Sequence, residues 1–487
     1  METERAISRY DYFRRVNALC ELITGALATG AETPEALAGH LPGLLQALPE
    51  YHASLIPRVY PDLIEALLKR KNRNAIGTFL LAFQQYLTDL TDGIDRGSPV
   101  VSNFPFFSPE IFLGMGLVPC LSEAVPLIIA LALTDGVAQE LDETEREGLP
   151  GHVCGFQRVP MKAIEKGLLP KPDLFVTNTA PCDSSNIMYH YISERLRVPV
   201  VWVDSPYYND ARAFRYYLEE FRRMVEELER ATGRTLDEDR LREHVEMGNE
   251  QLRYLYKLQD LRKHAPCPDP GMHRVLDTLA VMMCGVNRRM VEYTKTCYEE
   301  ARARVERGTT FLPEGKREIR TLWTYSHLPN LLSLASWLED EFGSTYLECP
   351  LSFLPGDRVG TVDTASVDSM LEGLAWRSFH FPMHRNVMGY SDVHVNEVVQ
   401  IARTYHAQAA LFGGNHTCKY AWTLPKILRD VLEDELGIPS LTYEVDYMDA
   451  RFAPHASVKA ALGEFFRTQT GSEPPGAGPG AGAEAAG

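Results

Sequence analysis

Three cysteines carry the clearest chemical signal in this sequence of 487 residues: Cys154, Cys182 and Cys418. Each stands just before a stretch whose residue pattern predicts a helix. At a helix N-terminus, unpaired backbone N–H groups and the helix dipole favour the thiolate form of a cysteine. Thiolates are soft ligands that suit zinc and iron–sulfur clusters. We therefore expect the three cysteines to hold one metal centre.

The cysteine spacing contains no CxxC pair and no ferredoxin-type run, so the ligands would come from distant parts of the chain. Free cysteine is among the most buried residue types. Cys120 and Cys349 end predicted strands near the expected site and are intermediate candidates. The other cysteines lie in mostly apolar helical sequence and are expected to be small buried side chains: Cys20, Cys267, Cys284 and Cys297.

The residue pattern divides the chain into regions that would position these cysteines. We predict a helical region at residues 1–107, a first α/β lobe at 108–210, a helical connecting region at 211–307 and a second α/β lobe at 308–470. Residues 471–487 consist only of Gly, Ala, Pro, Ser and Glu and are expected to be disordered. The predicted fold class is therefore α/β with two parallel-sheet lobes and additional N-terminal and central helices.

Short apolar runs and helical periodicity locate the main elements. The predicted strands cover residues 111–118, 173–178, 199–204, 319–325, 345–349, 409–412 and 440–445. The predicted helices cover residues 12–27, 76–90, 212–231, 237–264, 330–341, 394–405 and 422–436, with Thr235 as the cap of the fourth and Asp183, Ser184 and Ser185 as caps after Cys182.

The two lobes share a strand-to-loop passage. A strand at 173–178 leads to Cys182, and a strand at 409–412 leads to Cys418. Because open parallel sheets bind ligands beyond the carboxyl ends of their strands, each cysteine falls where a site is expected. Both lobes would thus contribute to one cleft.

Composition limits the partners and the location. The formal charge of −17 argues against nucleic acid or an anionic membrane surface as the main partner. The N-terminus lacks the regions of a signal peptide, and the longest apolar run, near residues 124–133, is about half a membrane span. Nine cysteines without regular spacing do not suggest a secreted disulfide framework. We expect a cytoplasmic protein.

Longer segments around the cysteines resemble one known family. They are Cys154-Gly-Phe-Gln-Arg158, Asp173-Leu-Phe-Val-Thr-Asn-Thr-Ala-Pro-Cys182-Asp183, Val198-Pro-Val-Val-Trp-Val-Asp204-Ser-Pro206, His416-Thr-Cys418, Glu435-Leu-Gly-Ile-Pro439-Ser-Leu-Thr-Tyr-Glu-Val-Asp446 and Asp449-Ala-Arg451. They are similar to the 2-hydroxyacyl-CoA dehydratase and benzoyl-CoA reductase subunit family, including the D component of 2-hydroxyglutaryl-CoA dehydratase. The similarity covers roughly residues 109–210 and 315–467.

This resemblance implies two flavodoxin-like lobes with a 4Fe–4S cluster between them. Cys154, Cys182 and Cys418 match the three ligand positions, and one iron would lack a cysteine ligand. A double-cubane cluster occurs in related proteins. The resemblance further implies an acyl-CoA substrate, a homologous partner subunit in a homo- or heterodimer, and a separate ATP-hydrolysing iron–sulfur activator.

The family's dehydratases remove water after one electron reduces the thioester to a ketyl radical anion, which expels the hydroxyl group and acidifies the β-hydrogen. The electron returns after product forms. This sequence contains no G-x-x-x-x-G-K-[ST] loop, since Gly315-Lys316-Arg317 lacks both the upstream glycine and the hydroxyl residue. ATP would therefore be handled by the activator.

Three further residues are candidates for the chemistry. Glu123 is either a proton acceptor or substrate contact, or a first-turn glutamate that complements a helix dipole. Arg158 either steadies the charge of the cluster or a substrate carbonyl, or forms a surface ion pair. His416 either donates to cluster sulfide and shuttles a proton, or is a structural loop histidine. Residues 323–327 either line the cleft or pack in the core.

Two alternative functions stay open at this point. The chain is either a dehydratase subunit or a subunit of an ATP-dependent reductase, resembling benzoyl-CoA reductase or the double-cubane-cluster proteins. A third interpretation is a non-catalytic scaffold in which the cysteines hold structural zinc, with His416 as the obvious fourth ligand.

Overall fold

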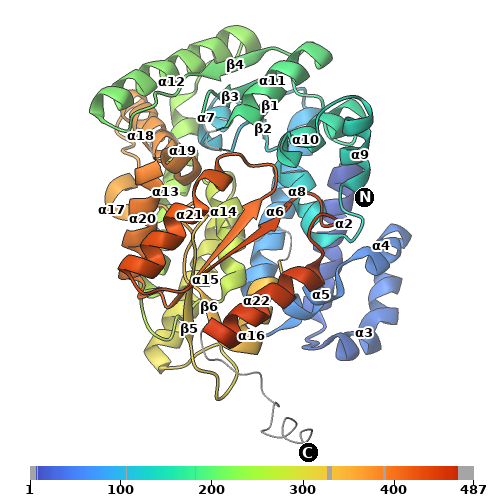
Figure 1. The fold of residues 1–487 in the computed structure, drawn as a ribbon. Coiled ribbons are helices and arrows are strands. Elements are labelled where there is room, and N and C mark those ends of the chain that lie inside the picture. Colours follow the sequence, from blue (N-terminus) through green and yellow to red (C-terminus); the bar gives the residue numbers. More distant parts are fainter. Residues whose placement is uncertain are drawn as a thin grey trace, which may run out of the picture.

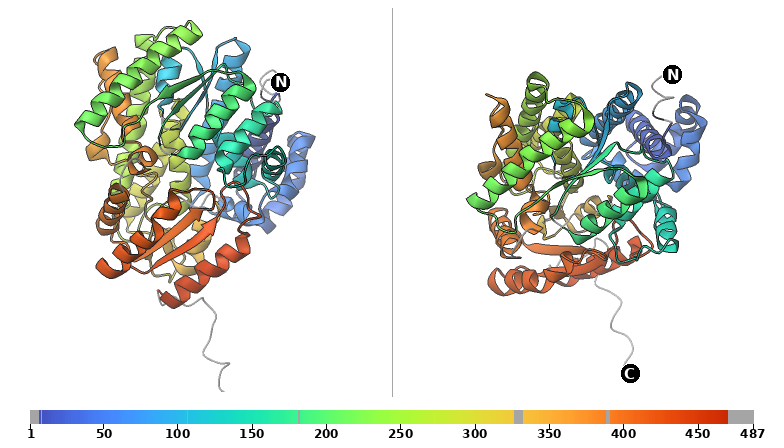
Figure 2. Two further views of the ribbon diagram at one scale, coloured as in Figure 1. Left: turned by 45° about the horizontal axis from the view of Figure 1, so that its top comes forward. Right: turned by 90° about the horizontal axis from the view of Figure 1, so that it is seen from above.

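The computed structural model describes residues 7, 9–105, 107–180, 182–325, 332–387 and 391–469. The tail at 471–487 that the composition predicts to be disordered lies outside these residues, as do residues 326 and 327 of the 323–327 segment. Within the described residues the chain forms two parallel sheets with helices around and between them (Figures 1 and 2).

The N-terminal region is helical, as predicted. Helix α2 contains the predicted segment 12–27, and α6 contains the segment 76–90. Its elements are α2 (Asp11–Ala28), α3 (Pro34–Ala47), α4 (Glu50–Leu55), the 3-10 helix η1 (Ile56–Arg58), α5 (Pro61–Leu68) and α6 (Arg73–Asp95). Helices α2 and α6 bury their apolar faces against each other and against the first lobe.

The first lobe contains a four-stranded parallel sheet in the order β2-β1-β3-β4. Its strands are β1 (Val100–Asn103), β2 (Val118–Cys120), β3 (Leu174–Asn178) and β4 (Val200–Val203). Its helices are α7 (Pro109–Gly114), α8 (Ala124–Ala132), α9 (Ala138–Arg146), α10 (Gly155–Glu165) and α11 (Asp183–Leu196). The predicted strands at 173–178 and 199–204 are confirmed, whereas β1 was not predicted.

The predicted strand at 111–118 is wrong. Most of this apolar run forms α7, and only its last residue begins β2. Pro109 occupies the first helical position, where its fixed φ and missing N–H are compatible with a helix. Because α7 is almost completely buried, it has no solvated polar face, and even its Glu110 is buried in an ion pair with Arg377. Its sequence therefore lacks helical periodicity.

The central region consists of four helices: α12 (Ala211–Thr232), α13 (Glu238–Leu261), α14 (Gly271–Met282) and α15 (Arg288–Arg307). Helix α15 packs against both α13 and α6, which joins the central and N-terminal helices. The predicted helices at 212–231 and 237–264 are confirmed. The cap of α13 is Asp237 rather than Thr235, because the Asp237 side chain accepts the backbone N–H of Arg240.

The second lobe repeats the topology of the first, with strand order β6-β5-β7-β8 and parallel pairing throughout. Its strands are β5 (Ile319–Trp323), β6 (Ser344–Tyr346), β7 (Ala409–Asn415) and β8 (Ser440–Val445). Its helices are α16 (Leu334–Phe342), α17 (Gly356–Val359), α18 (Val367–Phe379), α19 (Pro382–Val387), α20 (Ser391–Thr404), the 3-10 helix η2 (Ala421–Thr423), α21 (Pro425–Asp430), the π-helix η3 (Val431–Glu435) and α22 (His455–Gln469).

Two predicted boundaries in this lobe need correction. The single helix predicted at 422–436 is divided into η2, α21 and η3, because Pro425 cannot donate a backbone hydrogen bond and begins a new helix. Strand β7 continues past residue 412 to Asn415. It can do so because Gly414 has no Cβ, which would lie 2.8 Å from Cζ2 of Trp422.

Both sheets have the order 2-1-3-4, which is the beginning of the flavodoxin-like order 2-1-3-4-5. The prediction of an α/β protein with two flavodoxin-like lobes is confirmed. In this topology the switch point lies between the first and third strands, at their carboxyl ends. The expected ligand positions are therefore beyond β1 and β3 in the first lobe and beyond β5 and β7 in the second.

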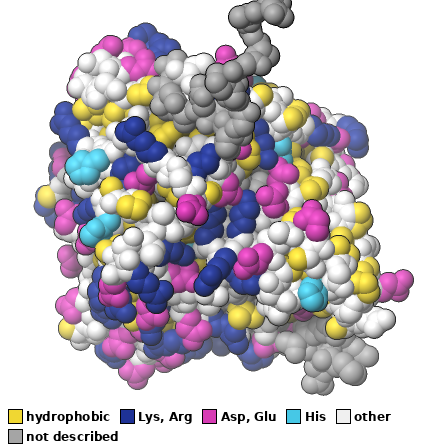
Figure 3. Space-filling model, turned by 90° about the horizontal axis from the view of Figure 1, so that it is seen from below, with side chains coloured by type: hydrophobic (Ala, Val, Ile, Leu, Met, Phe, Trp, Pro, Cys, Tyr) yellow, Lys and Arg dark blue, Asp and Glu magenta, His cyan; other side chains and the backbone are white. Residues whose placement is uncertain are grey.

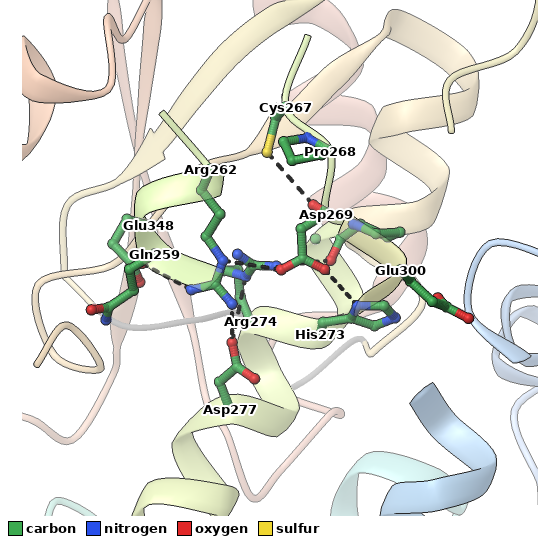
Figure 4. A network of polar contacts seen from close by, with 12 residues as sticks. Gln259, Arg262, Cys267, Pro268, Asp269, His273, Arg274, Asp277, Glu300 and Glu348 are labelled. Atoms are coloured by element: carbon green, nitrogen blue, oxygen red, sulfur yellow. Dashed lines mark hydrogen bonds and ion pairs between the residues drawn. The ribbon is translucent and has the colours of Figure 1, made fainter. Parts of the chain in front are cut away.

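A buried ionic network joins the central helices to the second lobe (Figure 4). Arg262, just after α13, bonds Asp269 at 3.0 Å, Glu348 at 3.1 Å and also Asp277. Arg274 bonds Asp269, and His273 Nδ1 lies 2.7 Å from Asp269 Oδ1. Since Glu348 follows β6, this network fixes the second sheet relative to α13 and α14.

None of the helices in the described residues has the length and apolarity needed to cross a membrane.

Candidate metal centre

Cys154 lies at the N-cap of α10 and faces the second lobe. Its Sγ receives a hydrogen bond from Nδ2 of Asn415, at the end of β7, over 3.7 Å. The next residue must be small, because a Cβ on Gly155 would lie 2.9 Å from Cβ of Met448. The ring of Phe156 contacts that of Tyr447 at 5.9 Å. The start of α10 is thus packed directly on the second lobe.

Cys182 lies beyond β3 and is itself the N-cap of α11. Its Sγ accepts the backbone N–H of Ser185 over 3.4 Å and contacts Ser185 Oγ at 3.0 Å. The caps predicted at residues 183–185 are therefore corrected: the sulfur of Cys182 caps the helix, while the Asp183 side chain accepts the backbone N–H of the adjacent Ser184, at 3.0 Å. Helix capping places this sulfur among backbone donors, as the sequence predicted.

Cys418 lies in the loop after β7, near the end of β5. It precedes the short η2 rather than a regular helix, and the backbone N–H groups of Tyr420 and Ala421 favour its thiolate. The Tyr325 hydroxyl lies 2.9 Å from Cys418 Sγ, and Cys349 Sγ donates to the Tyr325 carbonyl over 3.0 Å. Tyr325 therefore lines the site, whereas Trp323 of the same segment packs in the core against Tyr346.

The three thiols influence one another electrostatically, although they come from two lobes. Charge on Cys182 and on Cys418 raises the pKa of Cys154, and charge on Cys418 raises the pKa of Cys182. Their flanking residues also meet, since Lys419 Nζ lies 2.5 Å from Asp183 Oδ2. The structure thus brings the two predicted strand-to-loop passages and the start of α10 together at one place.

Burial has the largest effect on all three thiols. It raises the pKa of Cys182 to about 11 and raises the pKa values of Cys154 and Cys418 above their ordinary value. The side chains that bond the three sulfur atoms, Asn415, Ser185 and Tyr325, are all neutral. Without a positive charge the thiols would remain protonated. A metal bound here would supply that charge, since metal ligation deprotonates a thiol outright.

The donor set fits a cluster better than a single ion. Within the described ranges, no group of three or more His, Cys, Asp or Glu side chains is arranged to hold one metal ion. A tetrahedral zinc site needs four ligands, each about 2.0–2.3 Å from the ion. In an iron–sulfur cluster each cysteine binds a different iron, so the sulfur atoms stand farther apart. Three thiols from two lobes suit the second arrangement.

Glu123 lies at the N-cap position of α8, just beyond β2, and its side chain makes no capping hydrogen bond. Burial raises its pKa to about 7, although hydrogen bonds from Gln157 and Tyr189 partly offset this. Gln157 Nε2 donates to Glu123 Oε1 over 3.0 Å and the Tyr189 hydroxyl donates over 3.5 Å. These residues line a small pocket, and charge on Glu123 influences Cys182. The pair Gln157 and Tyr189 was not predicted.

Arg158 is buried rather than exposed, and its donors are turned toward the turn that precedes Cys154. Its guanidinium bonds the carbonyls of Val153 at 2.8 Å and Gly151 at 3.3 Å, together with Glu145 at 3.0 Å. The ion pair with Glu145 is therefore not the surface pair considered from the sequence. Arg158 fixes the backbone that carries Cys154.

His416 lies at the rim of the site. Its side chain is 45% exposed, and Nδ1 lies 2.7 Å from Glu444 Oε1. Its ring also packs on Phe452 with 4.1 Å between centroids. Both contacts hold the imidazole at the surface of the second lobe.

The remaining cysteines are buried and unpaired: Cys20, Cys120, Cys267, Cys284, Cys297 and Cys349. This agrees with the expectation for Cys20, Cys267, Cys284 and Cys297, although Cys267 lies between α13 and α14 rather than in a helix. Cys349 supports Tyr325, and Cys120 receives a weak hydrogen bond from Ser122 over 3.7 Å.

Comparison with known proteins places the chain in a family. The family model of the 2-hydroxyglutaryl-CoA dehydratase D component matches residues 105–468. The chain is 23% identical over 378 residues to the (R)-phenyllactyl-CoA dehydratase alpha subunit of Clostridium sporogenes, covering 73% of this chain and 86% of that protein. It is 19% identical to the lactoyl-CoA dehydratase subunit alpha of Anaerotignum propionicum, covering 75% and 90%. The (R)-2-hydroxyglutaryl-CoA dehydratase subunit alpha of Acidaminococcus fermentans is 22% identical, over 58% of this chain and 57% of that protein.

Because the family model matches most of the chain, the protein belongs to the 2-hydroxyglutaryl-CoA dehydratase D-component family.

Proposed function

We propose that this chain is the iron–sulfur subunit of a 2-hydroxyacyl-CoA dehydratase, with a 4Fe–4S cluster held by Cys154, Cys182 and Cys418. The observation that carries the proposal is the meeting of three partly buried thiols, without a bonded cation, at the carboxyl edges of two flavodoxin-like sheets. The names of the relatives support dehydration as the reaction. When bound, the cluster would supply a one-electron donor with one iron open to a substrate oxygen.

The protein's own residues would stabilise the ligands. Ser185 N–H and the Tyr325 hydroxyl donate to the sulfur atoms of Cys182 and Cys418, and Asn415 donates to Cys154. Such outer hydrogen bonds orient ligands and tune reduction potential. Arg158 would act as a positioning residue, because it fixes the turn before Cys154.

Glu123 would hold or accept a proton beside the reacting substrate. A pKa of about 7 allows a carboxyl group to do either near neutral pH. Gln157 and Tyr189 would orient the carboxyl group, and the surrounding apolar side chains would exclude water. His416 has a smaller part in the proposal, because its bond to Glu444 turns it toward the surface.

A homologous partner subunit and a separate ATP-hydrolysing activator belong to the proposal. The relatives are named alpha subunits, which implies a partner in those enzymes. Exposed large apolar side chains follow the strands and helices of the site: Ile187, Tyr207, Tyr208, Trp422, Ile427 and Phe452. In the proposed complex a partner subunit would cover some of these side chains. A cytoplasmic location is consistent with the nine free cysteines.

The zinc scaffold is less compatible with the geometry. It requires four ligands around one ion, with His416 as the fourth, and within the described residues no group of three or more His, Cys, Asp or Glu side chains is placed to hold a single ion.

The function is tested with the anaerobically purified chain, its partner subunit, an activator, ATP and a reductant. We expect dehydration of at least one of phenyllactyl-CoA, lactoyl-CoA and 2-hydroxyglutaryl-CoA, and its loss in Cys182→Ala. If a cluster-loaded preparation dehydrates none of them but reduces benzoyl-CoA or acetylene, the protein is an ATP-dependent reductase instead, and the dehydratase proposal is wrong.

A further inference from the structure

A basic groove lies outside the cysteine centre, between the start of α6 and the end of α15. We call it the α6–α15 groove, and its main lining residues are Arg70, Lys71, Asn74, Arg304, Arg307 and Phe311. Its volume of about 610 Å³ falls within the range of about 300–1,000 Å³ that is usual for small-molecule sites. None of these residues belongs to the loops that follow the sheet strands.

Two of the four cations in the groove already have carboxylate partners. Lys71 Nζ lies 2.6 Å from Glu339 and 2.8 Å from Asp340. Arg304 donates to the Pro268 carbonyl over 2.9 Å and to Glu300 over 3.4 Å. These pairs keep the two cations in place and leave them little excess charge.

The excess positive charge comes from Arg70 and Arg307. Both are exposed, and neither has a hydrogen bond or ion pair to any other described residue. Basic residues in the last turn of a helix complement its dipole, which explains Arg307 on α15. It does not explain Arg70, which comes from the turn between α5 and α6. Two guanidinium groups from separate elements thus share one groove without a partner.

The remaining lining residues add features of a nucleotide site. Asn74 lies in the first turn of α6, a helix of 23 residues whose N-terminal dipole favours an anion, and its Nδ2 donates over 2.8 Å to Glu300, which also lines the groove. Thr309 and Thr310 supply hydroxyl groups, and Phe311 supplies an aromatic face beside Lys71 Nζ, 5.6 Å from its ring centroid. Bases stack on aromatic side chains, and guanidinium groups bind phosphate with two parallel hydrogen bonds.

The overall charge of −17 makes a local excess of cations unusual on this protein. An acidic protein repels anions, so an anionic ligand requires a site with its own excess of cations. On the face seen from below, Lys and Arg side chains gather near the centre with acidic side chains among them (Figure 3).

We propose that the α6–α15 groove binds an organic polyphosphate of nucleotide size, with Arg70 and Arg307 on the phosphates and Phe311 against the base. The ligand is either a free nucleotide or the nucleotide end of a CoA thioester, which share this chemistry. Binding here does not require the cysteine centre to hold a cluster.

The test is calorimetric titration of the full-length chain with ADP, CoA and inorganic pyrophosphate. The Arg70→Gln/Arg307→Gln variant is compared with Arg288→Gln/Arg289→Gln, which removes the same charge from exposed positions in the first turn of α15. We expect ADP or CoA to bind saturably and the groove variant to bind at least about tenfold more weakly. The control should match the unmodified protein.

The identity of the bound probe separates the two sources. Binding of CoA without ADP assigns the groove to the CoA thioester, whereas binding of ADP as tight as that of CoA assigns it to a free nucleotide. If pyrophosphate binds as tightly as both, the base contributes nothing and the nucleotide proposal is wrong. Absence of binding by every probe at millimolar concentration, or equal affinity in the groove variant, would also overturn it.

Discussion

The cysteine centre and the Arg262 network are both buried polar clusters, but their charges are balanced in different ways. In the network Arg262 and Arg274 face Asp269, Asp277 and Glu348. Burial lowers the pKa of His273, but Cys297 and Asp269 outweigh this effect and raise it, so the histidine supplies a third positive charge. The network is therefore close to neutral without any ligand (Figure 4).

The cysteine centre has no comparable internal compensation. Its three thiols and Glu123 are all acids whose pKa values are raised by burial. Their hydrogen-bond partners are neutral side chains and backbone N–H groups. Buried charges are normally paired or coordinate metals. The network is therefore balanced as a structural joint, whereas the three thiols are neutral acids that would become thiolates only with a bound metal to balance their charge.

The largest expected effect comes from removing the central cation of the network. Arg262→Met would remove the guanidinium that lies between Glu348 and Asp277, while Arg274 and His273 still face Asp269. We expect a loss of about 3–5 kcal/mol of unfolding free energy. Arg288→Met removes an exposed arginine that pairs with Glu250 and should cost about 0–1 kcal/mol. Denaturant unfolding followed by circular dichroism measures both. Equal midpoints for the two variants would show that the network does not stabilise the fold.

At the cysteine centre we expect the opposite result, with a small effect on stability and a large effect on metal binding. Cys418→Ala should leave the unfolding midpoint of the metal-free protein nearly unchanged, because Cys418 is only partly buried. It should lower bound iron at least about tenfold, since even the loss of an outer partner costs about 10–100-fold. Cys20→Ala, at a buried cysteine far from the centre in sequence, should retain iron. Iron retention in Cys418→Ala would remove this residue from the ligand set.

The contribution of the neutral donors is tested at Tyr325. Tyr325→Phe removes the hydroxyl that donates to Cys418 Sγ and should lower the reduction potential of the cluster, because hydrogen bonds to sulfur stabilise the reduced form. Tyr443→Phe is the matched control, since the Tyr443 hydroxyl has no hydrogen-bond partner. Anaerobic redox titration compares the two. A potential that is unchanged in both variants would show that the hydroxyl does not act on the cluster.

The smallest expected effect is the pH dependence that Glu123 contributes to stability. Burial raises its folded pKa from the ordinary value of 4.5 to about 7. Relative to Glu123→Gln, the stabilisation by the protonated side chain is fully present below about pH 4.5 and is lost as pH rises through about 7. Denaturant unfolding between about pH 5 and about pH 8 should reveal this decline. Glu143→Gln, whose carboxyl pKa is lowered by Gln139 and Lys166, should give a flat difference over the same range.

Much of the architecture could be predicted from periodicity and composition. The long amphipathic helices α12 and α13 show their 3.6-residue pattern because one face of each is solvated. The buried elements were harder. Helix α7 is buried on nearly every side and was predicted as a strand, and β1 has only four residues and was not predicted. Burial removes the contrast between faces on which the prediction depends.

Only those site residues could be predicted whose position follows from neighbouring elements along the chain. Cys182 and Cys418 were located by the strand-to-loop passage that parallel sheets require. Tyr325, Asn415, Gln157 and Tyr189 act through packing between distant segments, and no local spacing identifies them. The orientation of Arg158 and His416 likewise depends on their partners Gly151 and Glu444, which only the folded chain brings beside them.

The central claim is that three thiols from two lobes hold a cluster with one iron open. Iron and sulfide quantification of the anaerobically purified chain, combined with electron paramagnetic resonance of the reduced protein, tests it most directly. The claim predicts about four irons and four sulfides for each cysteine centre, a reduced-cluster signal, and a change in that signal when a 2-hydroxyacyl-CoA is added. A colourless protein that contains one zinc and no sulfide would contradict it.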